Sequence, residues 1–415
     1  MSVEQGSRRT LSVGLAVSIA LGFTICLLGS SLKNTVQVFF LPMAETFGQS
    51  RGSFALATTV FAATYAVAAP VTGLLADRFG AGRVLQLGAV CGGAAFLLCA
   101  SVPSFALFVM VYGVVAAFAY AMLSYIPMGV LVDRVFADGR KGFFYALLTN
   151  GTAAGFMLLV PLWTWLDGRH SWQMVLGWLG VFLLVVIAPL TGWQFSKAGL
   201  SKTVRRSGSV RPLVRAALST TVFWRLAGAF SACGITMAFI DVHMIPYLHD
   251  HDVAEGISAT SIVLLGAFEI GGSLLAGRLC DRGLIKSVLI CGYLLRAGSM
   301  LLIAVAPHGP FVLLFGALFG MSYLVAIIAT SLWVLTVFPV EVRGVLIGLM
   351  WTMHQIGAAL SSQLGGLTHD STGSYLPAIL ASGTTALVAA ALINTLPPPN
   401  RSQADHQVPH SQDAR

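Results

Sequence analysis

The stretch "GLLADRFGAGR" runs from Gly73 to Arg83 and returns in a related form as "AGRLCDRGLIK" from Ala276 to Lys286. Each copy lies between two long apolar runs, and its aspartate, Asp77 or Asp281, is followed directly by an arginine. The two aspartates are 204 residues apart, about half of the 415-residue chain. A repeat at this distance predicts two tandem halves of similar topology.

Charged residues are scarce throughout the chain. Lys, Arg, Asp and Glu make up 10% of it, and hydrophobic residues make up 56%. A soluble globular protein carries roughly 25% charged residues. A chain so poor in charge cannot cover a water-facing surface of its size. The composition therefore predicts a protein whose solvent is the lipid bilayer.

Twelve apolar runs are long enough to cross a bilayer, since a membrane-spanning helix needs about 20 apolar residues. They lie near residues 11–40, 52–76, 84–102, 105–132, 142–165, 172–194, 219–247, 257–280, 286–306, 310–337, 343–367 and 375–396. Six of them fall in each half of the repeat. We therefore predict an all-α polytopic membrane protein, with twelve transmembrane helices in two pseudo-symmetric six-helix bundles.

The polar stretches give the domain boundaries. A basic stretch at 195–218 divides the chain, so residues 11–194 are predicted to form the N-terminal bundle and residues 219–396 the C-terminal bundle. Residues 1–10 are predicted to be a cytoplasmic tail. Residues 397–415 are polar and proline-rich, a composition that predicts a disordered cytoplasmic tail.

The distribution of basic residues orients these helices. With the N-terminus in the cytoplasm, nineteen of the 24 Lys and Arg residues fall in cytoplasmic segments, and only Arg51 and Arg169 fall outside. Cytoplasmic segments of membrane proteins carry such an excess. We therefore predict a multi-pass protein of the cell inner membrane with both termini in the cytoplasm. The formal net charge of +8 follows from this topology, and no nucleic-acid binding is expected.

The motifs that carry enzyme chemistry are missing from the sequence. The six cysteines include no C-x-x-C pair, so we predict no metal site and no cofactor. Neither H-E-x-x-H nor G-x-S-x-G occurs. A membrane-embedded enzyme and a sensor with a soluble output domain are therefore the disfavoured alternatives to a transporter.

The repeated motif resembles the signature of the major facilitator superfamily, G-x-L-x-D-R-x-G-x-R. The matching residues are Gly73, Leu75, Asp77, Arg78, Gly80 and Arg83, with one extra residue before the last arginine, and Arg278, Asp281 and Arg282 mark the second copy. The resemblance implies a transporter that works by alternating access. It also implies that the acidic and basic side chains of the motif pair across the cytoplasmic ends of neighbouring helices, and that this pairing breaks when the transporter turns outward.

Four further segments resemble the monocarboxylate-transporter branch and its bacterial relatives. They are "LKNTVQVFFLPMAETFGQSRGSFA" at 32–55, "VHMIPYLHDHDV" at 242–253, "GAFEIGGSLLAG" at 266–277 and "HQIGAALSSQLGG" at 354–366. The resemblance implies a secondary active transporter that moves a small organic anion, above all a monocarboxylate, by proton symport. Ser273 stands where that branch usually has an arginine, so transport or export of a neutral or aromatic metabolite or a vitamin is the alternative.

Ionisable residues inside the apolar runs are the candidate site, because a charge at the centre of a span costs at least ~2.5–3.5 kcal/mol and such residues usually face a cavity. Lys33 is predicted to bind the substrate anion; the alternative is a lysine that extends to the outer interface. Glu269 is predicted to exchange the proton or to pair with Lys33; the alternative is a structural hydrogen bond between helices. Asp241 is the second candidate for proton coupling.

The predicted substrate-binding set contains neutral polar side chains and histidines as well as the lysine. Its members are Lys33, Asn34, Tyr120, Asn150, His243, Ser273 and His354. For His243 an interface-facing role is the alternative, and for His354 it is a bond to a backbone carbonyl. Arg296 lies in the ninth span, which the resemblance places outside the cavity, so a structural role is predicted for it. The expected partners are a small anionic molecule, protons and the lipid bilayer.

Overall fold

The computed structural model describes residues 2–136, 140–197 and 210–399. Twelve stretches of helix within these residues are long and apolar enough to cross a membrane. They are Gly14–Val38, Ser53–Phe79, Ala81–Ser101, Phe105–Val135, Lys141–Leu166, Trp172–Lys197, Thr221–Asp250, Glu255–Asp281, Ile285–Val305, Gly309–Val337, Arg343–Thr372 and Leu376–Asn394. The predicted all-α fold with twelve spans is confirmed.

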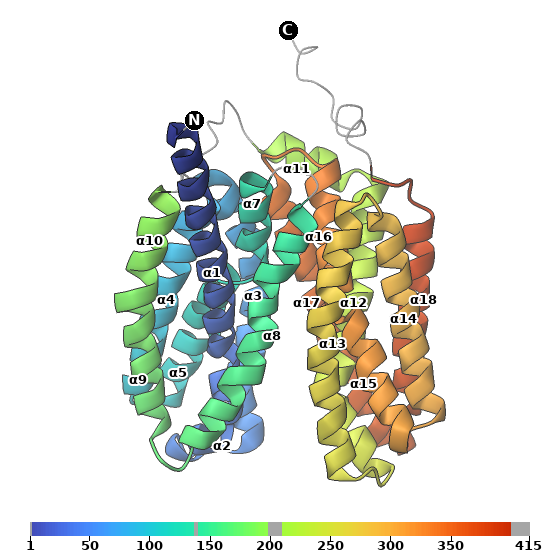
Figure 1. Ribbon diagram of the computed structural model, residues 1–415. Helices are drawn as coiled ribbons and strands as arrows, with labels where there is room; N and C mark the ends of the chain where they lie inside the picture. The colour runs from blue at the N-terminus through green and yellow to red at the C-terminus, as the bar shows by residue number, and fades with distance from the viewer. Residues whose placement is uncertain (1, 137–139, 198–209, 400–415) are drawn as a thin grey trace. The chain divides into compact units, whose positions relative to one another are not determined.

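The chain folds into two compact units, coloured blue to green and yellow-green to red in Figure 1. The first contains residues 1–136 and 147–206, and the second contains residues 137–146 and 207–415. One helix therefore contributes to both units, because the turn at 141–146 packs with the second unit while the rest packs with the first. Half of the predicted linker at 195–218, residues 198–209, and most of the predicted tail at 397–415, residues 400–415, lie outside the described residues.

Serine caps and small residues shape the first unit. Its helices are α1 (Ser2–Val38), α2 (Phe40–Thr46), α3 (Arg51–Phe79), α4 (Ala81–Ser101), α5 (Phe105–Met110), η1 (Val111–Ala116), α6 (Ala117–Met122), α7 (Tyr125–Val135), α8 (Lys141–Leu166), α9 (Trp172–Phe182), η2 (Leu183–Ile187) and α10 (Ala188–Lys197). The side chains of Ser50, Ser104 and Ser171 accept a backbone N–H at the starts of α3, α5 and α9. A Cβ on Gly151 or Gly155 of α8 would meet backbone carbonyls of α1, so glycine permits this close contact.

Two tight helix pairs dominate the second unit. Its helices are α11 (Arg211–Leu218), α12 (Thr221–Asp250), α13 (Glu255–Asp281), α14 (Ile285–Val305), α15 (Gly309–Tyr323), α16 (Val325–Val337), α17 (Arg343–Thr372) and α18 (Leu376–Asn394). Helix α12 packs on α17 through Gly234 and Gly357, and α13 packs on α15 through Gly272, Gly316 and Gly320. At each of these glycines a Cβ would meet the backbone of the partner helix, so the register of each pair is fixed.

The fourth and tenth spans are each interrupted along their length. Helix α6 ends at Met122 and α7 begins at Tyr125, whereas α15 ends at Tyr323 and α16 begins at Val325. The interruptions are about as far apart in the chain as the two motif aspartates, as the predicted repeat requires. An interruption releases backbone carbonyl groups from helical hydrogen bonds, and inside a membrane these groups need other donors.

Candidate functional site

Glu269 lies on the face of α13 that packs against the end of α15. Leu265 lies one turn before Glu269, and its backbone touches Gly320 of α15 so closely that a Cβ on Gly320 would clash with the Leu265 carbonyl oxygen. Gly272 lies one turn after it, and a Cβ there would meet the carbonyl oxygen of Met321. Residues spaced by three or four share one helix face, so Glu269 points at the same turn of α15. Glu269 is 9% exposed, and its carboxylate has no hydrogen bond or ion pair with the other described residues.

Arg296, on α14, reaches the same turn of α15. Its Nη2 donates to the carbonyl oxygens of Ser322 and Tyr323, both at 2.8 Å, and these are the last two residues of α15. Its Nη1 donates to Thr236 Oγ1 and to Cys233 Sγ, both at 3.0 Å. Arg296 is 1% exposed. A cation is favoured at the C-terminal end of a helix, but these acceptors are all neutral groups and leave its charge unbalanced.

Asp241 of α12 completes a charged cluster at the end of α15. The hydroxyl of Tyr323 donates to Asp241 Oδ1 at 3.1 Å. Glu269 interacts electrostatically with both Asp241 and Arg296. We call these four residues the α15 cluster. With both carboxyls ionised its formal charge is −1, and one bound proton makes it neutral, which is the favoured state in a medium of low dielectric constant.

Lys33 and Asn34 are neighbours on α1 of the first unit. Lys33 is half-buried, and its Nζ lies 6.0 Å from the centre of the Phe156 ring of α8. No carboxylate of the described residues lies within salt-bridge distance of it. Asn34 is fully buried, its Nδ2 donates to Ser30 Oγ at 3.3 Å, and its Oδ1 has no donor among the described residues. Among the described residues, Lys33 thus offers an ammonium group without a carboxylate partner, and the next residue offers an amide oxygen without a donor. Both groups suit a polar ligand.

The other two predicted polar residues of the first unit lie on different helices. Asn150 is buried on α8, the helix whose aromatic ring lies near Lys33. Tyr120 is half-buried on α6, and its ring centre lies 5.1 Å from that of Tyr65 and 5.7 Å from that of Phe61. The structure therefore places Lys33 and Asn150 on the α1–α8 pair and Tyr120 in an aromatic group with α3.

The remaining predicted residues are buried at helix contacts of the second unit. His243 Nε2 donates to the carbonyl oxygen of Ser362 on α17 at 2.9 Å. His354 is buried against aromatic rings of α12 and α17. Ser273 Oγ donates to the carbonyl oxygen of Ile270 at 2.8 Å. The two histidine contacts join α12 to α17, whereas the serine bond stays within α13. A role in substrate binding stays a prediction for all three residues.

The second copy of the repeated motif caps a helix. The Asp281 carboxylate accepts hydrogen bonds from the backbone N–H groups of Gly142 at 2.7 Å and Phe143 at 2.9 Å, in the first turn of α8. Arg278, one turn earlier on α13, lies over the Phe143 ring with its Cζ 4.8 Å from the ring centre. A carboxylate at a helix N-terminus satisfies free N–H groups and opposes the helix dipole. Arg282 is exposed beside this cap.

The first copy of the motif lies at the junction of α3 and α4. Asp77 is 1% exposed, and its carbonyl oxygen accepts from Nη2 of Arg134, in the last turn of α7, at 3.3 Å. Gly80 ends α3 with a φ of 90°, a conformation that favours glycine. Arg78 and Arg83 are exposed. The motif therefore orders the junction of α3 and α4 and joins it to α7.

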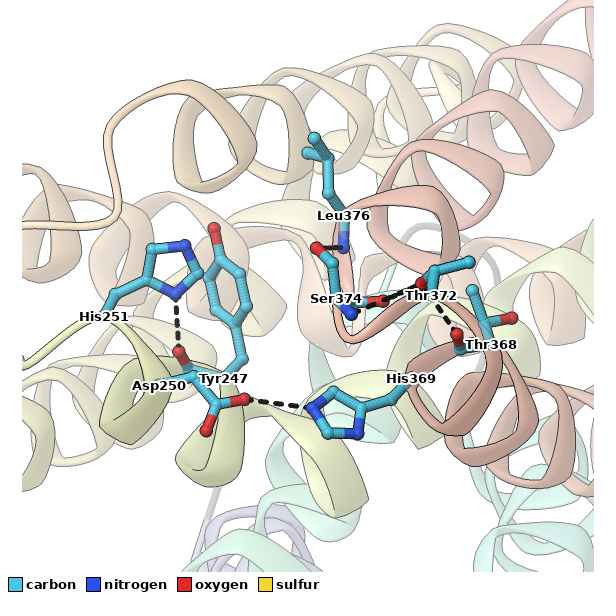
Figure 2. A network of polar contacts seen from close by, with 8 residues as sticks. All are labelled: Tyr247, Asp250, His251, Thr368, His369, Thr372, Ser374 and Leu376. Atoms are coloured by element: carbon cyan, nitrogen blue, oxygen red, sulfur yellow. Dashed lines mark hydrogen bonds and ion pairs between the residues drawn. The ribbon is translucent and has the colours of Figure 1, made fainter.

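A second polar network joins the ends of α12 and α17 (Figure 2). His369 Nε2 lies 3.4 Å from Asp250 Oδ2, and His251 Nδ1 lies 2.8 Å from the carbonyl oxygen of Tyr247. The side chains of His369 and Asp250 are 33% and 43% exposed, so solvent screens their interaction. None of these residues belongs to the predicted site.

Two members of the α15 cluster are absent from the site predicted from sequence. A signal for Arg296 is present, because an arginine eleven residues after the start of α14 stands in an apolar run where charge is costly. Tyr323 has no comparable signal, since a tyrosine within an apolar run is ordinary. Its role depends on the interruption after α15, which the apolar run does not reveal.

Comparison with known proteins agrees with the repeated motif. A family model described as Major Facilitator Superfamily matches residues 19–362 and 244–412. The chain is 31% identical over 357 residues to YcxA, an uncharacterized MFS-type transporter of Bacillus subtilis (strain 168), and the match covers 84% of this chain and 86% of YcxA. It is 27% identical over 402 residues to monocarboxylate transporter 11 of Homo sapiens, covering 92% of this chain and 82% of that protein.

The fold is similar to that of the E. coli fucose:proton symporter FucP. The TM-score is 0.70 at 15% sequence identity, and the match covers 91% of this chain and 98% of FucP. Twelve spans, a repeated motif at half the chain length and these relatives agree with one another. The chain belongs to the major facilitator superfamily of membrane transporters.

Proposed function

We propose that this chain is a secondary active transporter that moves a small organic anion, above all a monocarboxylate, together with a proton by alternating access. The α15 cluster is the observation that carries this proposal, because it has two carboxyl groups for one cation. Relatives at 22% and 27% identity are monocarboxylate transporters. FucP, which shares the fold, is a proton symporter.

Glu269 is the proposed proton carrier. It is buried, makes no hydrogen bond among the described residues, and lies near one carboxylate and one guanidinium. Gaining a proton brings the α15 cluster to neutrality, and losing it places a negative charge on the buried Glu269, whereas the Asp241 carboxylate is exposed. Each protonation state therefore favours a different arrangement of the surrounding helices, which is the property that a coupling residue needs.

Lys33 is the proposed contact for the substrate carboxylate. Its ammonium group has no carboxylate partner among the described residues, so a substrate anion would not have to displace one. The neighbouring Asn34 adds a buried amide that is only partly hydrogen-bonded. The proposed location is the inner membrane with both termini in the cytoplasm, supported by the excess of basic residues in the segments assigned to that side.

A neutral or aromatic metabolite is the alternative substrate class. One observation favours it, the aromatic rings that gather around Tyr120. The resemblance to the monocarboxylate-transporter branch adds that Ser273 stands where that branch usually has an arginine. Lys33 then has no anion to bind and serves to hold α1 near the interface.

Uptake into proteoliposomes tests the proposal. Radiolabelled monocarboxylates and a panel of vitamins and aromatic metabolites are offered with and without an inwardly directed proton gradient. The proposal predicts that a monocarboxylate accumulates above its external concentration only when the gradient is present. Accumulation of a neutral compound, with no response to any carboxylate, would establish the alternative instead.

A further inference from the structure

The carbonyl groups at the end of α15 hold a guanidinium to which the proposed function assigns no separate role. Ser322 and Tyr323 lie immediately before the interruption at Leu324, and both carbonyl oxygens accept from Arg296 Nη2. The other end of the guanidinium is held by Thr236 and Cys233 of α12. Arg296 is thus fixed on two sides by neutral acceptors, with α12 on one side and the end of α15 on the other.

The same turn of α15 faces Glu269. The backbone contacts of Leu265 with Gly320, and of Gly272 with Met321, place Glu269 against residues 320–323 independently of any electrostatic argument. Arg296 and Glu269 therefore approach one turn of helix from two neighbouring helices, α14 and α13. Their charges interact, although no hydrogen bond joins them.

The first unit shows that an interrupted span can be packed without an arginine beside it. The residue 204 positions before Arg296 is Gly92, on α4 of the first unit. The atoms nearest to a Cβ on Gly92 would belong to the side chains of Leu32 and Ala119, so the corresponding place beside the interrupted fourth span is filled by apolar packing. The buried guanidinium is therefore an addition to the second unit, and the proton carrier lies in that same unit.

We propose that Arg296 is the positioning residue that stabilises Glu269 after it has released its proton. This inference rests on the proposed role of Glu269 as proton carrier. A carboxylate newly formed away from water needs a cation at fixed distance, and the neutral acceptors around Arg296 hold one there without cancelling its charge. Lys33 belongs to the other unit, and a cation within the second unit removes the need for it as a partner of Glu269.

The other titratable groups around Arg296 are few. Helix α12 brings Asp241, Cys233 and His243, and α17 brings His354. Helix α15 brings Tyr323, whose hydroxyl is bonded to Asp241, and α14 itself carries Tyr293, whose hydroxyl donates to the Ala229 carbonyl oxygen. Helices α16 and α18 carry no ionisable side chain. Of the groups just named in the described part of the chain, Asp241 is the one carboxylate, and it accepts from the Tyr323 hydroxyl.

Substitutions that separate charge from hydrogen bonding test the proposal. Arg296→Lys keeps the charge, and Arg296→Gln keeps two donors without it. Each purified variant is reconstituted and assayed for accumulation of the monocarboxylate under a proton gradient and for substrate exchange at equal pH. Arg225→Gln is the control, because Arg225 also donates to a backbone carbonyl at a helix end, that of Thr395, in the same unit.

The glutamine variant should lose accumulation by about tenfold or more, within the range that coupling between two sites produces, while its exchange stays near that of the wild type. The lysine variant and the Arg225→Gln control should accumulate. The double variant Glu269→Gln/Arg296→Gln should accumulate no less substrate than either single variant. Both substitutions disable the same step, proton release by Glu269, so their effects should not add.

Three outcomes would overturn the inference. One is an Arg296→Gln variant that accumulates substrate normally although Glu269→Gln does not. This result would keep Glu269 as the proton carrier and would reject the role of Arg296. Another is an Arg296→Lys variant that folds and exchanges but does not accumulate, a result that remains decisive if the glutamine variant fails to fold. A Glu269→Gln variant with normal accumulation would instead reject the proposed function itself, and this inference with it.

Discussion

Asp281→Asn perturbs the cap that holds the first turn of α8. The carboxylate accepts two backbone N–H bonds, at 2.7 and 2.9 Å, whereas asparagine keeps one acceptor oxygen and loses the charge. Hydrogen bonds to charged groups contribute about 1.5–3 kcal/mol each, and Asp281 is half-buried, so solvent reduces this value. We expect a loss of about 1–2 kcal/mol, which corresponds to a factor of about 5–30 in the equilibrium between the capped and uncapped turn.

Hydrogen–deuterium exchange of peptides covering residues 141–146 measures this equilibrium directly. The Asp281→Asn variant should exchange faster in that segment by the factor just given, and its transport cycle should slow while its substrate affinity is retained, because the cap acts on the balance between states. Asp252→Asn is the matched control, since Asp252 is an exposed loop residue with a φ of 52° that asparagine also adopts readily. Unchanged exchange at 141–146, or a large loss of affinity with normal turnover, would refute the reasoning.

Three further predictions address binding, topology and packing. Lys33→Ala should abolish transport without loss of expression, and Lys33→Arg need not restore it because the two cations differ in shape and hydration; wild-type affinity in the alanine variant would remove Lys33 from the site. Reporter fusions after residue 205 and at the C-terminus should read as cytoplasmic and a fusion after residue 250 as external; the reverse pattern would invert the proposed orientation. Gly272→Ala should destabilise the purified protein by about 1–3 kcal/mol, the usual cost of overpacking, because its Cβ would meet the α15 backbone. Gly271→Ala is the control, since a Cβ there has open space and the variant should melt like the wild type. Equal melting temperatures for the two variants would contradict the packing described.

The twelve spans could be predicted because each depends on a local property, the length of an apolar run. Their ends agree with the helices within a few residues; the first run, expected near 11–40, corresponds to Gly14–Val38. The interruption at Leu123–Ser124 has a local cause in the sequence, because Pro127 has no N–H to donate and in a continuous helix its ring would clash with the carbonyl group of Leu123. The interruption at Leu324 has no such signal, since the apolar run continues through it without a proline or a charge.

The candidate site could be predicted only in part, for a related reason. An acidic residue in an apolar run is costly wherever it points, so Glu269 was identifiable from the sequence. Its neighbours depend on contacts between distant segments: Arg296 reaches carbonyl groups 26 and 27 residues further along the chain. The cap on α8 joins Asp281 to residues 138 and 139 positions earlier, and no local pattern announces such a partner.

The transport phenotype of Glu269→Gln tests the central claim most directly. Glutamine resembles the protonated acid in shape and charge but cannot release a proton. In proteoliposomes, the variant should exchange labelled monocarboxylate at close to the wild-type rate and should fail to concentrate it under an inward proton gradient, while Glu255→Gln, an exposed acid at the start of the same helix, should do both. A Glu269→Gln variant that still concentrates the substrate in response to the gradient would contradict the account.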